Sequence, residues 1–216
     1  MEFWHSELVE SSWSTLQQLK NRYEFTLVGG WAVYLYTKAL KSKDIDIIVD
    51  YSALEALGRE FPLKKNVRLR KYELLLGGVE IDIYVPFFSR LGIPVEDVAA
   101  HVTILEGFRV PKPEILLILK QAAELDRVGS VKGFKDRLDI LALLIHVAID
   151  WDNYKALVKK YSLNNYRDRL VEIVESAGRE FEELGIRNPR RIKQIKSRIL
   201  AEFSSRLDAK GPAHPP

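Results

Sequence analysis

Two aspartates occupy alternate positions in one apolar run, and a glycine pair interrupts another apolar run just before them. The aspartates are Asp44 and Asp46, in the stretch Asp-Ile-Asp-Ile-Ile-Val, and the glycine pair is Gly29-Gly30. Because strand side chains alternate between the two faces of a sheet, this spacing puts both carboxylates on one face. The order of strand, glycine pair, helix and strand predicts two carboxylates on a sheet beside a helix N-terminus.

A third carboxylate, Asp82, stands in a similar run, Val-Glu-Ile-Asp-Ile-Tyr-Val. Carboxylates on strands of this apolar character are costly to bury unless they are paired or bind a metal. Each feature alone has an ordinary explanation, since Asp-x-Asp is common in surface loops and a Gly-Gly pair is often only a turn. The three features together favour a site for divalent metal and triphosphate, in which the amides after Gly29 and Gly30 point at phosphate.

Such a site suits the transfer of a nucleotide from a triphosphate. That chemistry uses two Mg²⁺ (or Mn²⁺) ions, which need carboxylate oxygens held on rigid strands. We expect Asp44 and Asp46 to reach the metal on the triphosphate. Asp82 would complete the second metal and act as the base for the acceptor hydroxyl, or orient that base. All three are predicted to be both catalytic and metal-binding.

The hydrophobic pattern predicts an α+β fold, with a small mixed β-sheet and helices followed by an all-helical C-terminal domain. Strands are expected at residues 25–28, 44–49, 68–76, 79–85, 101–105 and 108–110, and helices near 8–19, 31–40, 53–61, 114–125, 134–149, 151–161, 165–184 and 189–207. Gly77-Gly78 predicts a tight hairpin turn. Ser52 is expected to be the N-cap of the third helix, with Glu55 completing a capping box.

A proline pair at Pro111-Lys112-Pro113 marks the predicted domain boundary. We expect a catalytic domain over residues 1–110, a helical domain over 111–208 and a disordered tail over 209–216.

Composition narrows the function classes. The 216 residues are 47% hydrophobic and 29% charged, which is typical of a folded domain, and the net charge of +3 is too small to indicate a nucleic-acid partner. The absence of cysteine excludes disulfides and thiolate metal sites, and the four scattered histidines have no zinc-site spacing. No apolar run reaches the roughly 18 residues of a membrane span, and no signal peptide is visible. We therefore expect a cytoplasmic protein without membrane contact.

The set of Gly29, Gly30, Asp44, Asp46 and Asp82 resembles the DNA polymerase β-like nucleotidyltransferase superfamily. The stretch Leu-Val-Gly-Gly-Trp-Ala, with Ser-Lys-Asp-Ile-Asp after it, is most similar to small prokaryotic branches of that superfamily. These are the AbiEii-type toxins of type IV toxin–antitoxin systems, the minimal nucleotidyltransferases paired with HEPN proteins, and the lincosamide or aminoglycoside nucleotidyltransferases. The match covers roughly residues 24–85.

The resemblance implies a short mixed sheet and Mg²⁺-dependent transfer of a nucleoside monophosphate from an NTP such as ATP. By position, Gly29 and Gly30 would hold the phosphates. Many members have Gly-Ser at this point, with a hydroxyl that contacts phosphate, whereas the second residue here is Gly30. Ser42 could supply that hydroxyl instead, and it is predicted to bind nucleotide.

The C-terminal part also resembles the AbiEii-like branch, through the spacing of Pro113, Lys120, Arg127, Asp136 and Asp139. The resemblance implies that the helical Lys120 meets the triphosphate and that the later aspartate lies near the pocket. Two alternatives stay open, because Lys120 could be a residue of the pocket rim whose stem lies along apolar surface. Asp136 and Asp139 could likewise cap a helix or form ion pairs.

Two other features have both an ordinary structural interpretation and a functional one. Trp31 could stack on a base, although a tryptophan after a glycine pair is more often part of a core. The segment from Arg187 to Arg198 has six basic residues and no acidic one, so it could contact RNA backbone. Its apolar stripe also suits an ordinary packed helix with a solvated basic face.

Three functions compete at this point. The first is an active nucleotidyltransferase whose acceptor hydroxyl is on RNA (tRNA), protein or a small molecule. Within it, a toxin–antitoxin role with a cognate partner leads by resemblance, and antibiotic modification is second. The second is a catalytically inactive adaptor that binds RNA or protein, against which the three intact aspartates argue. The third is a protein that acts mainly through a partner bound to its helical half.

Overall fold

The structure is a computed structural model that describes residues 2–205, and the side chains of residues 7–204. Its main sheet is mixed and has seven strands, in the order β3 (Lys64–Asn66), β4 (Lys71–Leu76), β5 (Val79–Tyr84), β2 (Ile45–Ile48), β1 (Thr26–Val28), β9 (Phe108–Pro111) and β8 (Val102–Leu105). β2 runs parallel to β5, and β1 runs parallel to β9. The other neighbouring pairs are antiparallel. This mixed sheet confirms the predicted α+β class.

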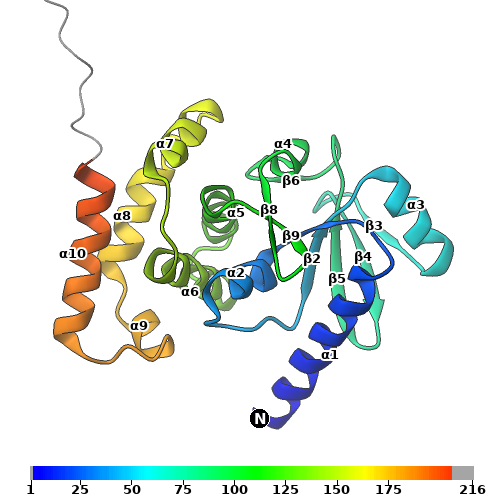
Figure 1. The fold of residues 1–216 in the computed structure, drawn as a ribbon, viewed down its shortest axis with the longest axis horizontal. Coiled ribbons are helices and arrows are strands. Elements are labelled where there is room, and N and C mark those ends of the chain that lie inside the picture. Colours follow the sequence, from blue (N-terminus) through cyan, green and yellow to red (C-terminus); the bar gives the residue numbers. More distant parts are fainter. Residues whose placement is uncertain (1, 206–216) are drawn as a thin grey trace, which may run out of the picture.

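The first helices pack around the sheet, and after the last strand the chain is helical, from α5 to α10 (Figure 1). The helices are α1 (Glu2–Lys20), α2 (Gly29–Thr37), α3 (Tyr51–Glu60), α4 (Val95–Ala99), α5 (Pro113–Asp126), α6 (Val131–His146), α7 (Trp151–Lys160), α8 (Tyr166–Ser176), α9 (Arg179–Glu183) and α10 (Pro189–Ser205). α5 and α6 pack on each other and on α2, and α6 also contacts α10. The helical region thus rests on the sheet region through α2.

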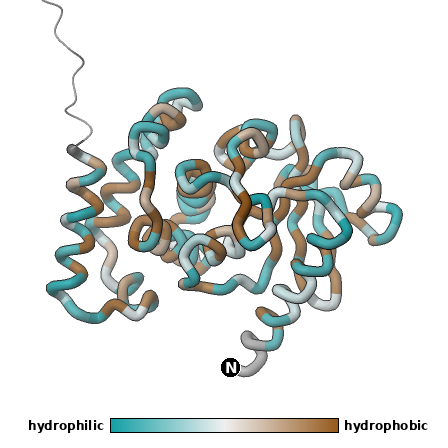
Figure 2. The backbone as a smooth tube through the Cα atoms, viewed as in Figure 1, coloured by the Kyte–Doolittle hydropathy of each residue, from teal (hydrophilic) through white to brown (hydrophobic). Residues whose placement is uncertain are grey.

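The apolar face of the sheet is the face opposite the aspartates. Ile45 and Ile47 on β2, and Ile81 and Ile83 on β5, alternate with the acidic positions and are buried. On this side, Trp13 of α1 packs on Phe108 of β9 at a ring separation of 5.8 Å. In Figure 2 the backbone is hydrophobic along much of the sheet, and it alternates around α10, as a helix with one packed face should.

The glycine hairpin is confirmed. Gly77 and Gly78 join β4 to β5 with φ values of +58° and +84°, which a residue with a side chain rarely adopts. A two-residue turn of this kind fixes the register of the pair, so that Glu73 lies opposite Asp82.

The predicted cap of α3 is wrong. Asp50 is the N-cap, and its carboxylate accepts a hydrogen bond from the Ala53 amide at 2.7 Å. Ser52 lies inside the helix and its hydroxyl donates to Asp50 at 2.8 Å, while Glu55 pairs with Arg59 instead of closing a capping box. An ionised carboxylate is a stronger acceptor than a hydroxyl, and it stands at the position where the free amides of the first turn converge.

The single helix predicted over residues 165–184 is also wrong, because the structure has α8 and α9 with a break between them. Ala177 leaves the helix with an extended backbone, and the Gly178 amide donates to the Glu180 side chain at 3.1 Å. Sequence periodicity also missed β3, α4 and the two-stranded pair of β6 (Arg90–Leu91) with β7 (Ile93–Pro94). These elements are short, and β3 is built from polar residues without an apolar pattern.

The predicted boundary, between residues 110 and 111, falls before the last residue of β9, two residues ahead of the start of α5 at Pro113. Among the described residues, α5 and α6 on one side of this boundary contact α2 on the other side directly. The division into domains stays a prediction. The predicted tail, residues 209–216, lies outside the described residues. Within residues 2–205 no helix is long and apolar enough to cross a membrane.

Candidate active site

Two of the predicted aspartates are direct neighbours in the sheet. Asp46 on β2 and Asp82 on β5 are Cα partners in the parallel pair, so their side chains leave the same face about 4.8 Å apart. Both are partly exposed, as is Asp44, which directly precedes β2. The sequence spacing alone did not show that β2 and β5 are adjacent, and this adjacency is what brings Asp82 to the other two.

Gly29 is required where it stands. It begins α2 with a φ of +67°, and a Cβ added there would lie 2.0 Å from Oδ2 of Asp46. The Asp46 carboxylate therefore rests against the first residue of the helix. This close approach puts the carboxylate at the end of α2 where free amides and the positive end of the helix dipole lie.

Gly30 is likewise surrounded by polar atoms. A Cβ on Gly30 would lie 2.8 Å from Oγ of Ser42 and 3.4 Å from Nζ of Lys135. Lys135, on α6, donates a hydrogen bond to the Ser42 hydroxyl at 3.2 Å. The Ser42 hydroxyl thus occupies the space into which a side chain at residue 30 would extend, and its hydrogen bond keeps the Lys135 ammonium beside it.

The environment of Asp46 disfavours its charge. Burial raises the pKa of Asp46, the Asp44 carboxylate raises it further, and Lys120, Lys135 and Lys71 act in the opposite direction without cancelling the shift. The Tyr84 hydroxyl, two positions along β5 from Asp82, donates to Oδ1 of Asp46 at 3.4 Å. The pKa of Tyr84 is raised well above its usual value by burial and by these two aspartates, so it remains a donor at neutral pH.

Asp82 has a cation of its own. Nζ of Lys71, on β4, lies 2.6 Å from Oδ2 of Asp82 and 3.2 Å from Oε1 of Glu73. Burial and the neighbouring Asp46 nevertheless leave the pKa of Asp82 raised, because they outweigh the effect of Lys71. Sequence analysis missed Lys71. The hairpin register could have found it, because a two-residue turn at Gly77-Gly78 places Lys71 on the same face as Asp82.

The donor set fits a hard divalent cation, with one qualification from the geometry. Asp44 and Asp46 offer carboxylate oxygens at the end of a rigid strand, which is what Mg²⁺ prefers. Among the described side chains, however, no three acidic or histidine groups converge on one point as a metal cage would need. Asp82 is drawn to Lys71 instead of toward Asp46.

Lys120 borders the same site from the helical side. A cavity of about 90 Å³ is lined by Gly29, Asp46, Tyr84, Lys120 and Arg127, together with apolar neighbours. The buried Lys120 points its ammonium at α6, where Nζ lies 2.6 Å from Asp139 and 3.5 Å from Asp136.

Asp136 also pairs with Nε of Arg127 at 2.7 Å. Burial by itself lowers the pKa of Lys120, but Asp139 and Asp136 outweigh burial, so the pKa is raised. Asp136 and Asp139 therefore act as ion-pair partners of the cations that line the cavity.

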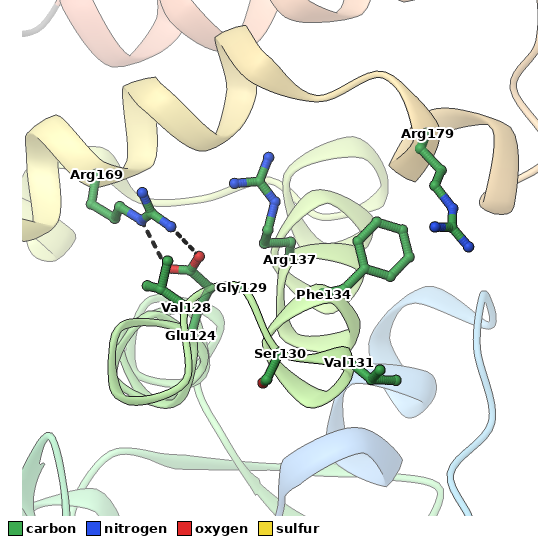
Figure 3. A pocket seen from close by; sticks show the side chains of 9 residues that line it. All are labelled: Glu124, Val128, Gly129, Ser130, Val131, Phe134, Arg137, Arg169 and Arg179. Carbon is green, nitrogen blue, oxygen red and sulfur yellow. Dashed lines mark hydrogen bonds and ion pairs between the residues drawn. The ribbon is translucent and has the colours of Figure 1, made fainter.

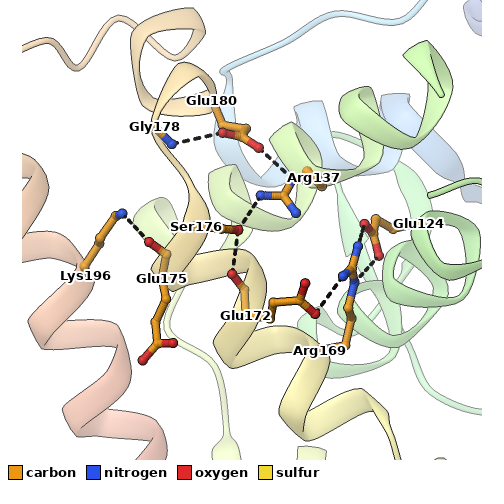
Figure 4. Close-up of polar contacts among 9 residues, drawn as sticks. All are labelled: Glu124, Arg137, Arg169, Glu172, Glu175, Ser176, Gly178, Glu180 and Lys196. Carbon is orange, nitrogen blue, oxygen red and sulfur yellow. Dashed lines mark hydrogen bonds and ion pairs between the residues drawn. The ribbon is translucent and has the colours of Figure 1, made fainter. Parts of the chain in front are cut away.

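A larger hollow of about 460 Å³ lies elsewhere, between α5, α6, α8 and α9 (Figure 3). Its arginines are already paired: Arg169 binds Glu124 and Glu172, and Arg137 binds Glu180 at 2.6 Å and Ser176 at 2.9 Å (Figure 4). These contacts tie the four helices together. The hollow contains none of the predicted site residues.

Two other candidates are placed by the structure. Trp31 is 1% exposed and its indole donates to Ser12 at 2.9 Å, so it belongs to the core and cannot stack on a base. On α10, Lys196 donates to the carbonyl of Glu175, and Arg198 donates to the carbonyls of Leu144 and Ile145. Arg187, Arg190 and Arg191 are exposed. RNA contact by this segment stays a prediction.

Comparison with known proteins identifies a solved structure with the same fold. No protein-family model matches the chain, and no curated protein matches it. Among solved structures, JHP933 from Helicobacter pylori aligns with a TM-score of 0.50 at 15% identity, over 92% of this chain and 94% of JHP933. The chain shares that fold. The alignment includes both the sheet and the helices that follow, so this combination is one fold common to both proteins.

Two further solved structures align less well. One is a Helicobacter pylori protein described as a proposed nucleotidyltransferase. It aligns with a TM-score of 0.47 at 15% identity, over 96% of this chain and 98% of that one. The other is an antigenic nucleotidyltransferase-like protein from Paracoccidioides brasiliensis, with a TM-score of 0.39 at 20% identity over 64% and 76% of the two chains.

Proposed function

We propose that this protein is a Mg²⁺-dependent nucleotidyltransferase, which moves a nucleoside monophosphate from an NTP to an acceptor hydroxyl. The observation that carries the proposal is the in-register pair of Asp46 and Asp82 on one face of the sheet, with Asp46 at the start of α2. A carboxylate pair with raised pKa values beside a helix N-terminus is a costly arrangement for stability alone. A bound cation and a triphosphate would relieve that cost.

Each group has a role in this proposal. Asp44 and Asp46 would hold Mg²⁺ (or Mn²⁺), which supplies neutralisation of the triphosphate charge. The amides of Gly29 and Gly30 face the phosphates, and Ser42 and Lys135 add a hydroxyl and an ammonium beside them. Lys120 gives positive potential at the cavity wall.

The transfer itself is a displacement at the α-phosphorus. Asp82 takes the proton of the acceptor hydroxyl, whose oxygen forms the new bond to phosphorus while the bond to pyrophosphate breaks. Its raised pKa suits this task, because a carboxylate that holds its charge reluctantly is a better base. The pyrophosphate leaves with the excess negative charge.

The finer assignment follows the AbiEii-like resemblance. We place the acceptor on RNA, with tRNA first, and consider protein and small-molecule acceptors as alternatives within the same chemistry. A toxin–antitoxin role would add a cognate partner protein. The alternative function, an inactive adaptor that binds RNA or protein, keeps the fold and does not need the carboxylates.

The test is incubation of the protein with each α-³²P-labelled NTP, Mg²⁺ and total RNA, next to an Asp44→Ala/Asp46→Ala variant. Label should move to RNA, to protein or to a small product, and the variant should move none. A control variant, Asp126→Asn, changes an exposed carboxylate at the end of α5 and should behave as the unmodified protein. If no NTP binds in the presence of Mg²⁺ or Mn²⁺, the enzyme proposal is wrong and the adaptor remains.

A further inference from the structure

The β4–β5 hairpin brings one ammonium group onto the carboxylate face. Nζ of Lys71 lies between Asp82 and Glu73, at 2.6 Å and 3.2 Å from their oxygens. The Lys71 side chain is 14% exposed and that of Asp82 is 28% exposed. By contrast, the ordinary surface pair of Arg59 with Glu55 is 75% and 67% exposed. Lys71 therefore turns away from solvent and toward a predicted catalytic carboxylate.

The position of this ammonium matters because of what surrounds it. Asp82 is the in-register neighbour of Asp46, and the Lys71 charge acts on both carboxylates. Lys120, on the helical side of Asp46, is committed to Asp139 and Asp136. Lys71 is thus the cation that directly contacts Asp82.

The pairing also explains the incomplete metal cage. A second divalent ion shared by Asp46 and Asp82 would have to lie between their oxygens. In the described part of the chain no three acidic or histidine side chains converge on such a point, and Oδ2 of Asp82 is bound to the Lys71 ammonium. An ammonium carries one positive charge and three donors, so it can neutralise Asp82 and still face an oxygen of a bound substrate.

We infer that the Lys71 ammonium takes the place of a second divalent ion at Asp82, so that the site binds one metal ion, through Asp44 and Asp46. This inference rests on the proposed nucleotidyltransferase function, and it departs from the two-metal scheme that the sequence alone predicts. Lys71 acts through Asp82, as a positioning residue whose ion pair holds this carboxylate in place without a metal.

The experiment counts metal ions directly. Mn²⁺ bound per chain is measured by electron paramagnetic resonance and equilibrium dialysis, with each of the four α,β-methylene NTP analogues in turn. The variants are Lys71→Met, which keeps the length of the stem and removes the charge, and Lys64→Met as the matched control. Lys64 is the cross-strand partner of Glu73 on β3, on the same face but one strand farther from Asp82.

The expected result is one Mn²⁺ per chain for the unmodified protein and for Lys64→Met, and two for Lys71→Met. Two Mn²⁺ in the unmodified protein, or one in the folded Lys71→Met protein, would overturn the inference while leaving the proposed function intact. No bound Mn²⁺ in any of the proteins would overturn both. Thermal unfolding verifies that the variants fold, and the count for the unmodified protein decides alone if Lys71→Met does not.

Discussion

Two pairs of aspartates lie near the small cavity, one on the strands and one behind the cations Lys120 and Arg127 that line it, and their surroundings differ. Asp136 and Asp139 on α6 are 2% and 0% exposed, and their charges meet Lys120 and Arg127. Asp46 and Asp82 on the strands are partly exposed, and their pKa values remain raised. The deeper pair is compensated by the protein, whereas the shallower pair is not compensated in full.

This contrast is the reason why we propose a structural role for the helical pair and a functional role for the strand pair. A fully buried charge must be paired within the fold, because removal from water costs several kcal/mol per ion. A carboxylate at the edge of a cavity can remain partly uncompensated if an external cation completes it, and perturbed groups of this kind gather at functional sites. In the proposed function, the strand pair is therefore the one that we assign to ligand binding.

The largest effect on stability should come from the helical pair. Lys120→Met removes the ammonium that Asp139 and Asp136 share, and breaking a buried ion pair by removal of one partner costs about 3–5 kcal/mol. Urea unfolding measures the change. The control Lys132→Met changes an exposed lysine on α6. It should lower the free energy of unfolding by less than about 0.5 kcal/mol. A loss below about 1 kcal/mol for Lys120→Met would show that the two aspartate pairs are not different in kind.

The strand pair should give the opposite pattern. Asp46→Asn removes a proposed metal ligand and should lower nucleotidyl transfer on the order of 10³-fold, or about 4 kcal/mol in the barrier. Its stability in the absence of metal should not fall, because burial disfavours the charge that the substitution removes. Transfer of α-³²P label and urea unfolding are measured on the same preparation. A variant that keeps its activity but unfolds more easily would reverse the assignment of the pairs.

A smaller effect should follow when the contact between Asp46 and α2 is disturbed. Gly29→Ala places a Cβ 2.0 Å from the Asp46 carboxylate in a backbone with φ of +67°, and should cost about 1–3 kcal/mol. Gly77→Ala is the matched control, since Gly77 has a φ of +58° with no atom within 4 Å of its added Cβ. Both variants should lose stability, but only Gly29→Ala should also lose transfer activity. Equal activity in the two would show that the Asp46 position does not matter.

Much of the sheet could be predicted from the sequence, because its strands carry strong local patterns. Alternation predicts that Asp46 faces away from its buried neighbours Ile45 and Ile47, as it does on β2, and the Gly77-Gly78 turn is recognisable from composition. The neighbours of a strand cannot be found in this way. The parallel pairing of β2 with β5, which brings Asp82 beside Asp46, is a long-range contact that no local period specifies.

The helical side of the site was harder to predict for a related reason. The resemblance pointed to Lys120, Asp136 and Asp139, but residue type could not distinguish ligand from ion-pair partner. That distinction depends on which side chains of α5 and α6 meet across the helix interface. The cap of α3 failed for a different reason, since Asp50 and Ser52 are both good N-cap residues and the choice depends on where the backbone leaves β2.

The most delicate way to compare the two aspartate pairs is the pH dependence of stability. The pKa of Asp46 is raised in the folded protein, so the folded state holds its proton more tightly than the unfolded chain, whose Asp pKa is near 3.8. Stability should therefore rise as the pH falls through the raised folded pKa toward that value. Asp46→Asn has no such proton to bind. Its advantage in stability should be fully present above the folded pKa and should disappear as the pH falls, as measured by urea unfolding without metal. A constant difference at all pH values would mean that the fold does not disfavour the Asp46 charge, and the contrast between the two pairs would fail.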